Sequence, residues 1–228
     1  MKLKTTFASV LFFALAICAY GQNVNRFPVW TYHEKNVNIH GISIGLVSTI
    51  ISERNTNTNG IKLELIGLGV FTPLIPEFPK FENGDSERIN GLSFSASGTV
   101  CDCLTNGLSV GAIGQINNQV NGISATMLMN VTGKQNGIML ALINMSDIMN
   151  GLQLGGVNAS ESEAHGVQLG FIGNESEVMR GLQIGLYNKS KNLRGVQIGL
   201  WNVNQKRKLP LINWNFKRTK ERETNEQE

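Results

Sequence analysis

The residues best suited to acid–base or metal chemistry form two pairs of glutamates in the C-terminal half of the chain. Glu161 and Glu163 precede Glu175 and Glu177 by 14 residues, and His165 follows the first pair. Converging carboxylates can act as general acid and base or hold a hard cation such as calcium. A glycan-processing enzyme would gather charged and aromatic residues in one groove, and the sequence shows no such gathering. We therefore expect a solvated acidic edge with no catalytic residue, no metal and no cofactor. A secreted glycan-acting enzyme is the weaker alternative.

Cys101 and Cys103 are the two cysteines that follow the N-terminal 21 residues. A disulfide between residues two apart is strained, although an exported protein could oxidise the pair. Metal binding would require further ligands, and His33, His40 and His165 lie far away in the sequence. The Cys-Asp-Cys segment is therefore interpreted as a structural or incidental pair.

Five asparagines match the Asn-x-Ser/Thr acceptor pattern of glycosylation. They are Asn130, Asn144, Asn158, Asn174 and Asn188. Asparagine tolerates left-handed backbone angles, and both asparagine and serine bond the backbone of their own turn. We therefore interpret these asparagines as corners of a structural repeat and not as glycan attachment sites.

The repeat is the strongest signal in the chain, and its units align on a leading glycine. The units that start at Gly181 and Gly195 read Gly-Leu-Gln-Ile-Gly-Leu-Tyr-Asn and Gly-Val-Gln-Ile-Gly-Leu-Trp-Asn. From Gly91 onward the interval between units is 14 to 16 residues. The ten leading glycines are Gly41, Gly60, Gly91, Gly107, Gly122, Gly137, Gly151, Gly166, Gly181 and Gly195. Units of this length bury too little on their own, so they must stack on one another.

Each unit begins with alternating residue types. The first and third positions after the leading glycine are apolar, whereas the second and fourth are mostly polar or small. Alternation with period two predicts a β-strand with one buried face, and we expect the apolar columns to form that face. A weaker apolar column precedes the next glycine, as at Val120, Met149 and Leu193, and predicts a second, shorter strand.

The predicted fold class is all-β, and two ways of stacking compete. In a parallel β-solenoid or β-roll of about ten or more short coils, equivalent residues lie ~4.8 Å apart, which explains why one residue type recurs in each column. The alternative is an antiparallel meander closing into a β-barrel, as in outer-membrane proteins. A tilted strand of about eight residues spans ~19 Å, less than the ~25 Å apolar band of such barrels, and aromatic girdles are missing. The sequence therefore favours the solenoid.

Under this assignment, the strand face opposite the core carries a row of glutamines between columns of glycine. The row consists of Gln153, Gln168, Gln183 and Gln197. A flat, amide-rich face is suited to docking, and we name these four residues as the candidate binding site. The candidate partners are a glycan, an envelope component or an identical subunit. The alternative interpretation of the row is a plain solvated ladder.

The two ends of the chain predict export and a capped array. Lys2 and Lys4 precede an apolar run over 7–19, which is typical of a secretory signal peptide cleaved before Gln22. The expected domain boundaries are a signal peptide over 1–21, an N-terminal lead or cap over 22–40, a β-repeat domain over 41–216 that includes an insertion or degenerate repeat at 71–90 and a capping unit at 208–216, and a disordered polar tail over 217–228.

The charge of the body argues against nucleic-acid binding. Residues 22–204 carry 11 basic and 13 acidic residues, so no basic face is available for a phosphate backbone. After the N-terminal run, no segment is long and apolar enough for a membrane helix. We therefore expect membrane contact only if the barrel alternative holds.

The repeat unit and the closing segment Leu-Pro-Leu-Ile-Asn-Trp at 209–214 resemble an uncharacterised family of bacterial surface-repeat proteins. The resemblance covers roughly residues 41–216 and is sharpest from Gly151 onward. It implies a place in the cell envelope, at the cell surface, in the outer membrane or outside the cell, and no particular reaction. We therefore expect an exported structural, adhesive or binding module, with a small outer-membrane pore or receptor as the alternative.

Overall fold

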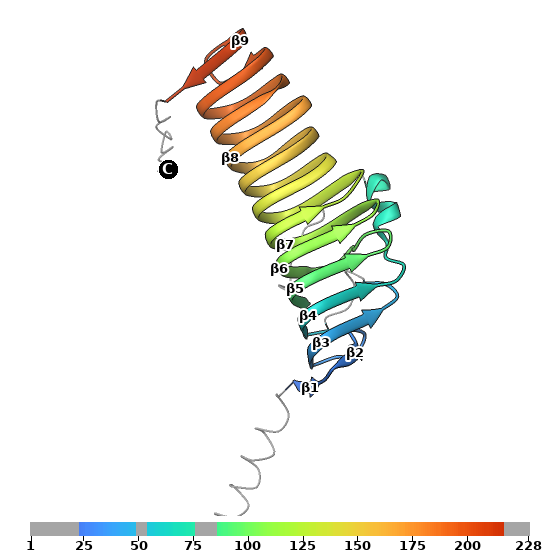
Figure 1. Cartoon of the computed structure of the whole chain (residues 1–228). Helices are drawn as coiled ribbons and strands as arrows, with labels where there is room; N and C mark the ends of the chain where they lie inside the picture. The colour runs from blue at the N-terminus through green and yellow to red at the C-terminus, as the bar shows by residue number, and fades with distance from the viewer. Residues whose placement is uncertain (1–22, 49–53, 76–85, 217–228) are drawn as a thin grey trace, which may run out of the picture.

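The computed structural model describes residues 23–48, 54–75 and 86–216. The predicted signal peptide and polar tail therefore lie outside the described residues. Within the described residues the chain winds into a β-solenoid whose coils stack from the N-terminal to the C-terminal end (Figure 1). Successive strands pair in parallel and in register, which confirms the predicted solenoid. The antiparallel meander that we weighed against it is wrong.

The solenoid consists almost entirely of strands. The N-terminal part contains β1 (Val24–Arg26), β2 (Val29–Thr31), β3 (Val37–Gly45), β4 (Thr56–Glu64), a 3-10 helix η1 (Gly69–Leu74), β5 (Glu87–Ser95), β6 (Cys103–Gly111) and β7 (Gly114–Ala125). The C-terminal part contains β8 (Met129–Val203) and β9 (Lys208–Asn215). Because β8 is continuous over 75 residues, strand structure extends through both the predicted first strand and the weaker second one in these coils.

The ten leading glycines form one column along the solenoid. Gly41, Gly60 and Gly91 pair in register, and the later glycines follow at intervals of 14 to 16 residues. The predicted count of ten or more coils was slightly too high, since the solenoid makes about six turns. Six regular intervals separate Gly107 from Gly195. The strands before Gly107 are joined by longer connections that leave the register of the column unchanged. We call each strand that follows a leading glycine a rung.

The leading glycines are required by the backbone and by the neighbouring rung. Their φ angles lie between +125° and +156°, a region that L-residues with a side chain rarely adopt. At Gly181 an added Cβ would lie 1.9 Å from the carbonyl oxygen of Gly166 in the preceding rung. The column therefore marks the place at which neighbouring coils approach backbone to backbone.

The interior of the solenoid is polar, and this contradicts our expectation for the strand faces. The second and fourth residues after the glycine point inward, together with the corner asparagines and serines. The apolar residues at the first and third positions point outward instead. The apolar part of the interior comes from the column two residues before the leading glycine. In this column Met149, Ala164, Met179 and Leu193 form a buried cluster.

The two ends of the solenoid are covered differently. At the N-terminal end, β1 and β2 both pair in parallel with β3, within the range 22–40 that we expected to form a lead or cap. β4 pairs directly with β5, so no rung lies between them, and η1 belongs to the connection that leaves β4. At the C-terminal end, β9 pairs antiparallel with the last rung of β8, as Figure 1 shows. No helix among the described residues is long and apolar enough to span a membrane.

Candidate binding face

The four predicted binding glutamines do not lie on a surface. Gln153, Gln168, Gln183 and Gln197 are all completely buried in the solenoid. Each later glutamine donates its side-chain N–H to the Oε1 of the one before it, at 2.7 to 2.8 Å. The structure brings the four residues together as predicted, but as an interior ladder. The expectation that this row lies on an exposed docking face is therefore wrong.

A second amide ladder runs parallel to the first. Its members are the corner residues Asn144, Asn158, Asn174, Asn188 and Asn202, linked by Nδ2–H···Oδ1 bonds of 2.7 to 2.9 Å. An amide carries both donors and acceptors, so identical amides stacked in register satisfy one another without water. The matches to the glycosylation pattern are thus buried corner residues, as the structural interpretation of them predicted.

The outside of the same strands is a continuous apolar sheet, which we call the outer apolar face. The first-position residues are Ile42, Ile61, Leu92, Leu108, Ile123, Ile138, Leu152, Val167, Leu182 and Val196. The third-position residues are Ile44, Leu63, Phe94, Val110, Ala125, Leu140, Leu154, Leu169, Ile184 and Ile198. β9 extends both columns, because Trp214 pairs with Val196 and Ile212 pairs with Ile198. None of these side chains is buried, and none is polar or charged apart from the indole of Trp214.

A hollow runs beside the outer apolar face at its C-terminal end. One wall consists of Leu154, Leu169, Ile184 and Ile198, and the other of Phe171, Leu186 and Leu200. Between the two walls the hollow is lined by Gly170, Gly185 and Gly199. The hollow measures about 700 Å³ and ends at Leu211 and Ile212 of β9. Phe171 is 80% exposed, so the outer wall stands free in solvent.

The edge of the face next to the leading glycines is polar. The residues just before these glycines form a third amide ladder of Asn59, Asn90, Asn106, Asn121, Asn136 and Asn150, with Nδ2–H···Oδ1 bonds of 2.7 to 2.8 Å. The ladder is continued by His165, Arg180 and Arg194 in the last rungs. The apolar sheet is thus bounded by a rim that is neutral along most of its length.

The glutamates that we considered for acid–base or metal chemistry form ion pairs with basic side chains. Glu175 pairs with Lys189 at 2.5 Å, and Glu177 pairs with Lys191 at 2.6 Å, each across one coil. The hydrogen bond from Lys189 to Glu175 raises the pKa of the lysine. Carboxylates in such pairs form a charged edge of alternating sign, in place of the acidic edge that we expected.

Two further glutamates complete this edge. Glu163 lies 2.9 Å from His165 and 3.9 Å from Arg180, while Glu161 is exposed. Within the described ranges, no three histidine, cysteine, aspartate or glutamate side chains lie close enough together to hold a metal ion. Among the described residues, these glutamates are therefore not gathered with other ligands into a cation site.

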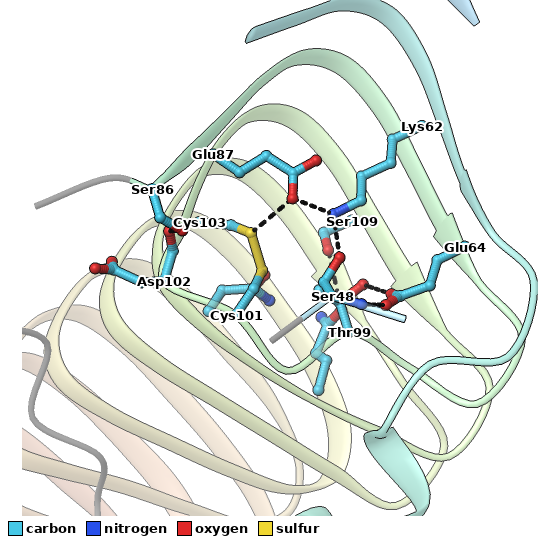
Figure 2. Close-up of a disulfide and its surroundings, with 12 residues drawn as sticks. Ser48, Lys62, Glu64, Ser86, Glu87, Thr99, Cys101, Asp102, Cys103 and Ser109 are labelled. Carbon is cyan, nitrogen blue, oxygen red and sulfur yellow. Dashed lines mark hydrogen bonds and ion pairs between the residues drawn. A yellow bond between two sulfur atoms is a disulfide. The ribbon is translucent and has the colours of Figure 1, made fainter. Parts of the chain in front are cut away.

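Cys101 and Cys103 form a disulfide in the interior (Figure 2). Both residues are fully buried, and Ile89 packs in the same cluster. Glu87 Oε2 lies 3.7 Å from Cys103 Sγ, which joins the disulfide to a group of buried charges. The pair is structural, as one of our interpretations had it, and the sulfurs are engaged with each other.

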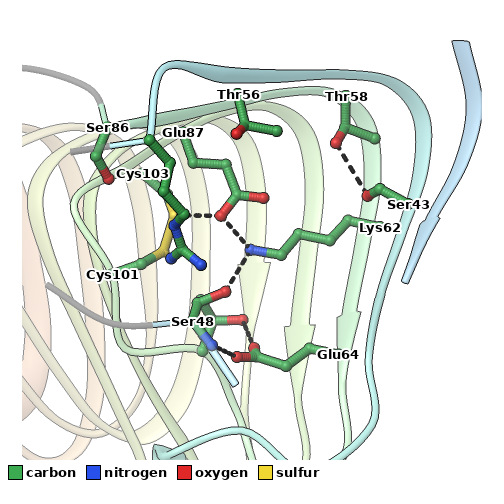
Figure 3. A network of polar contacts seen from close by, with 12 residues as sticks. Ser43, Ser48, Thr56, Thr58, Lys62, Glu64, Ser86, Glu87, Cys101 and Cys103 are labelled. Atoms are coloured by element: carbon green, nitrogen blue, oxygen red, sulfur yellow. Dashed lines mark hydrogen bonds and ion pairs between the residues drawn. A yellow bond between two sulfur atoms is a disulfide. The ribbon is translucent and has the colours of Figure 1, made fainter. Parts of the chain in front are cut away.

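Two of the buried charges, Lys62 and Glu64, occupy positions that hold glutamine and glycine in the last rungs. Lys62 Nζ donates to Glu87 Oε2 and to Ser48 Oγ, both at 2.8 Å, as Figure 3 shows. Glu64 accepts from the backbone N–H of Ser48 and from Thr99 Oγ1. The side chains of Lys62 and Glu87 have no exposed surface. This group therefore fills the interior and does not line a site open to a ligand.

Aromatic and histidine side chains cover the N-terminal side of this group. Lys62 Nζ lies 4.6 Å from the ring centroid of Tyr32. Burial, together with the nearby Glu64 carboxylate, raises the pKa of the Tyr32 hydroxyl. Burial and the Arg54 guanidinium lower the pKa of His33, whose Nε2 accepts the N–H of Leu46 at 3.2 Å. All of these shifts favour the neutral forms of Tyr32 and His33.

No protein-family model, no curated protein and no solved structure matches this chain.

Sequence reasoning missed the outer apolar face because it placed those columns in the core. One signal could have revealed the error. The repeat carries apolar residues on both sides of the leading glycine, and a coil of about 15 residues is too narrow to enclose both sets. The amide side chains of one column satisfy one another's hydrogen bonds in the interior. The aliphatic side chains have no hydrogen bonds to satisfy, so the solenoid can form with them on its outside.

Proposed function

We infer that this chain is an exported, non-catalytic repeat protein of the bacterial cell envelope that acts as a structural or adhesive module. One observation carries the proposal. The solenoid keeps its hydrogen-bonding amides inside and presents a ten-rung apolar sheet outside. Monomeric soluble proteins rarely expose contiguous apolar patches larger than a few hundred Å², and larger patches mark interaction sites. Attachment through the outer apolar face is therefore the activity that this geometry supports.

Two further observations support export. The N-terminal sequence has the basic start, apolar run and small residues of a signal peptide. A buried disulfide between Cys101 and Cys103 is typical of proteins that fold in an oxidising compartment. The glycan-acting alternative is less well supported, because three of the four candidate glutamates pair with basic side chains.

The proposal is tested by following the chain in fractionated cells that express it. We expect a mature N-terminus at Gln22 by mass spectrometry, and retention of the protein in the envelope fraction. The double variant Leu154→Lys/Ile184→Lys, which charges the outer apolar face, should still be exported but should be released from the envelope. The matched variant Val70→Lys/Leu74→Lys, which charges two exposed apolar residues of η1, should be retained. A cytoplasmic chain with residues 1–21 intact would contradict the proposal.

A further inference from the structure

The outer apolar face is large enough to form a specific interface with another macromolecule. Along the solenoid the face is ten rungs long, with about 4.8 Å between rungs, and along each strand it is about five residues wide, at about 3.3 Å per residue. These dimensions give an area of roughly 700 Å². Stable protein–protein interfaces bury about 800 Å² on each partner. Together with Trp214 and Ile212 of β9, the outer apolar face therefore has the area that one specific interface requires.

The face is also self-complementary in its spacing. Its side chains stand in two straight columns because the rungs pair in register without stagger. A second sheet with the same two spacings can interdigitate with it at the ~10 Å separation of aligned sheets. A copy of this chain, turned about a two-fold axis perpendicular to the solenoid, presents such a sheet.

The charges around the face favour a protein partner over a lipid surface. Interfacial membrane-binding elements carry lysine and arginine beside the apolar surface. Here the rim from Asn59 to Asn150 consists of amides that hydrogen-bond to one another, and basic residues enter it only at Arg180 and Arg194. No charge lies among the two columns, so a second copy would bury no unpaired ion. Along the edge next to the leading glycines, the face thus has the polar rim that is usual in a protein interface.

We propose that the outer apolar face is covered by a second copy of this chain, packed face to face with the two solenoids antiparallel. This inference rests on the proposed function: the face holds two copies together, and the assembled pair is the form retained in the envelope. Four residues of this interface are Leu154, Ile184, Ile198 and Ile123, each 38 to 40% exposed in the isolated chain.

The test is the mass in solution of residues 22–228, oxidised and without detergent, by sedimentation equilibrium. We expect the mass of two chains at low micromolar concentration. Leu154→Lys/Ile184→Lys should give the mass of one chain with an unchanged far-UV spectrum, because neither side chain points into the solenoid. Val70→Lys/Leu74→Lys should keep the mass of two chains. A second measurement uses Ile138→Cys, in a middle rung of the face, where a two-fold axis brings the two copies of one residue together. Ile138→Cys should form a disulfide-linked dimer on oxidation, whereas Leu74→Cys should not.

Three results would overturn the second copy, and one assay separates them from failure of the proposed function. A wild-type chain that sediments as one chain excludes the dimer, and so does a dimer that persists in Leu154→Lys/Ile184→Lys. The third is a monomer that sediments with vesicles of phosphatidylethanolamine and phosphatidylglycerol. In that case the face still acts in attachment, with lipid as its partner. If the wild-type chain is a monomer and Leu154→Lys/Ile184→Lys is still fully retained in the envelope fraction, the face has no attachment role either.

Discussion

At the scale of the residue, the solenoid depends on amides that complete one another. Gln168 donates to Gln153 and accepts from Gln183, both at 2.7 Å, with no exposed surface. A buried donor or acceptor left without a partner costs about 1–3 kcal/mol. The same residue type must therefore recur in each coil, because a different neighbour would leave an amide unsatisfied.

A pair of substitutions in the glutamine ladder tests this account. Gln168→Met keeps the shape of the side chain but leaves partners unsatisfied on both sides, whereas Gln197→Met affects only Gln183 among the glutamines. We expect Gln168→Met to lower the free energy of unfolding by about 2–4 kcal/mol and Gln197→Met by about half as much. Urea denaturation followed by circular dichroism measures both. Equal losses would show that the ladder does not act through its paired bonds.

At the scale of the element, the pairing of β4 with β5 is fixed by a buried ion pair. Lys62 lies in the glutamine column and meets Glu87 at 2.8 Å, with neither side chain exposed. Breaking such a pair by removing one partner costs about 3–5 kcal/mol, since the remaining charge stays buried without compensation. Replacing both partners with apolar side chains is far less costly. The ion pair thus specifies which strands stack at this point of the column.

The ion pair predicts a strongly non-additive response to substitution. Lys62→Met should destabilise the protein by about 3–5 kcal/mol, and Lys62→Met/Glu87→Leu should recover most of that loss. Lys191→Met removes the partner of Glu177 at an exposed pair and serves as the control, with little change expected. Thermal and urea unfolding of the wild type, Lys62→Met, Glu87→Leu, the double variant and the Lys191→Met control would measure the coupling. Additive losses in the double variant would contradict the prediction.

How far the elements could be predicted depended on what each pattern determines. The period of the repeat and the alternation of residue types identified the strands and the stacking. Alternation distinguishes two faces without saying which is inside, and we placed Leu154 in the core and Gln153 on the surface, the reverse of the structure. The rule that apolar residues are buried failed because a narrow coil is filled by Gln, Asn and Ser ladders. The Lys62–Glu87 contact joins residues 25 apart across an irregular connection, so no column pattern could show it.

At the scale of the whole molecule, the solenoid is a stack in which each coil contacts mainly its neighbours. The stability of such an array is approximately a sum over coils and the interfaces between them. The columns continue unchanged from Gly107 to Gly195 at intervals of 14 or 15 residues. A complete coil can therefore be removed without disturbing the register of those that remain.

Removal of one coil is a direct test of this property. Deletion of residues 167–181 joins Gly166 to Leu182 and preserves every column, so we expect a folded protein with a lower melting temperature. Deletion of residues 167–174 has a similar composition but shifts the inward residues of the following coils, and we expect it not to fold. Circular dichroism and thermal unfolding distinguish the two. A folded product from the second deletion would contradict the requirement for register.

The antiparallel β9 has a consequence for how long the object can grow. In a parallel stack, the open edge of the last coil presents the same N–H and C=O groups that each coil presented to the next, and such an edge can template further strands. β9 runs against the last rung of β8, and Pro210 within it has no N–H to offer. The stack is thereby terminated by its own sequence. The length of the molecule is therefore set by the number of coils that its sequence encodes. Without such a cap, chains would add end to end into filaments whose length depends on the protein concentration.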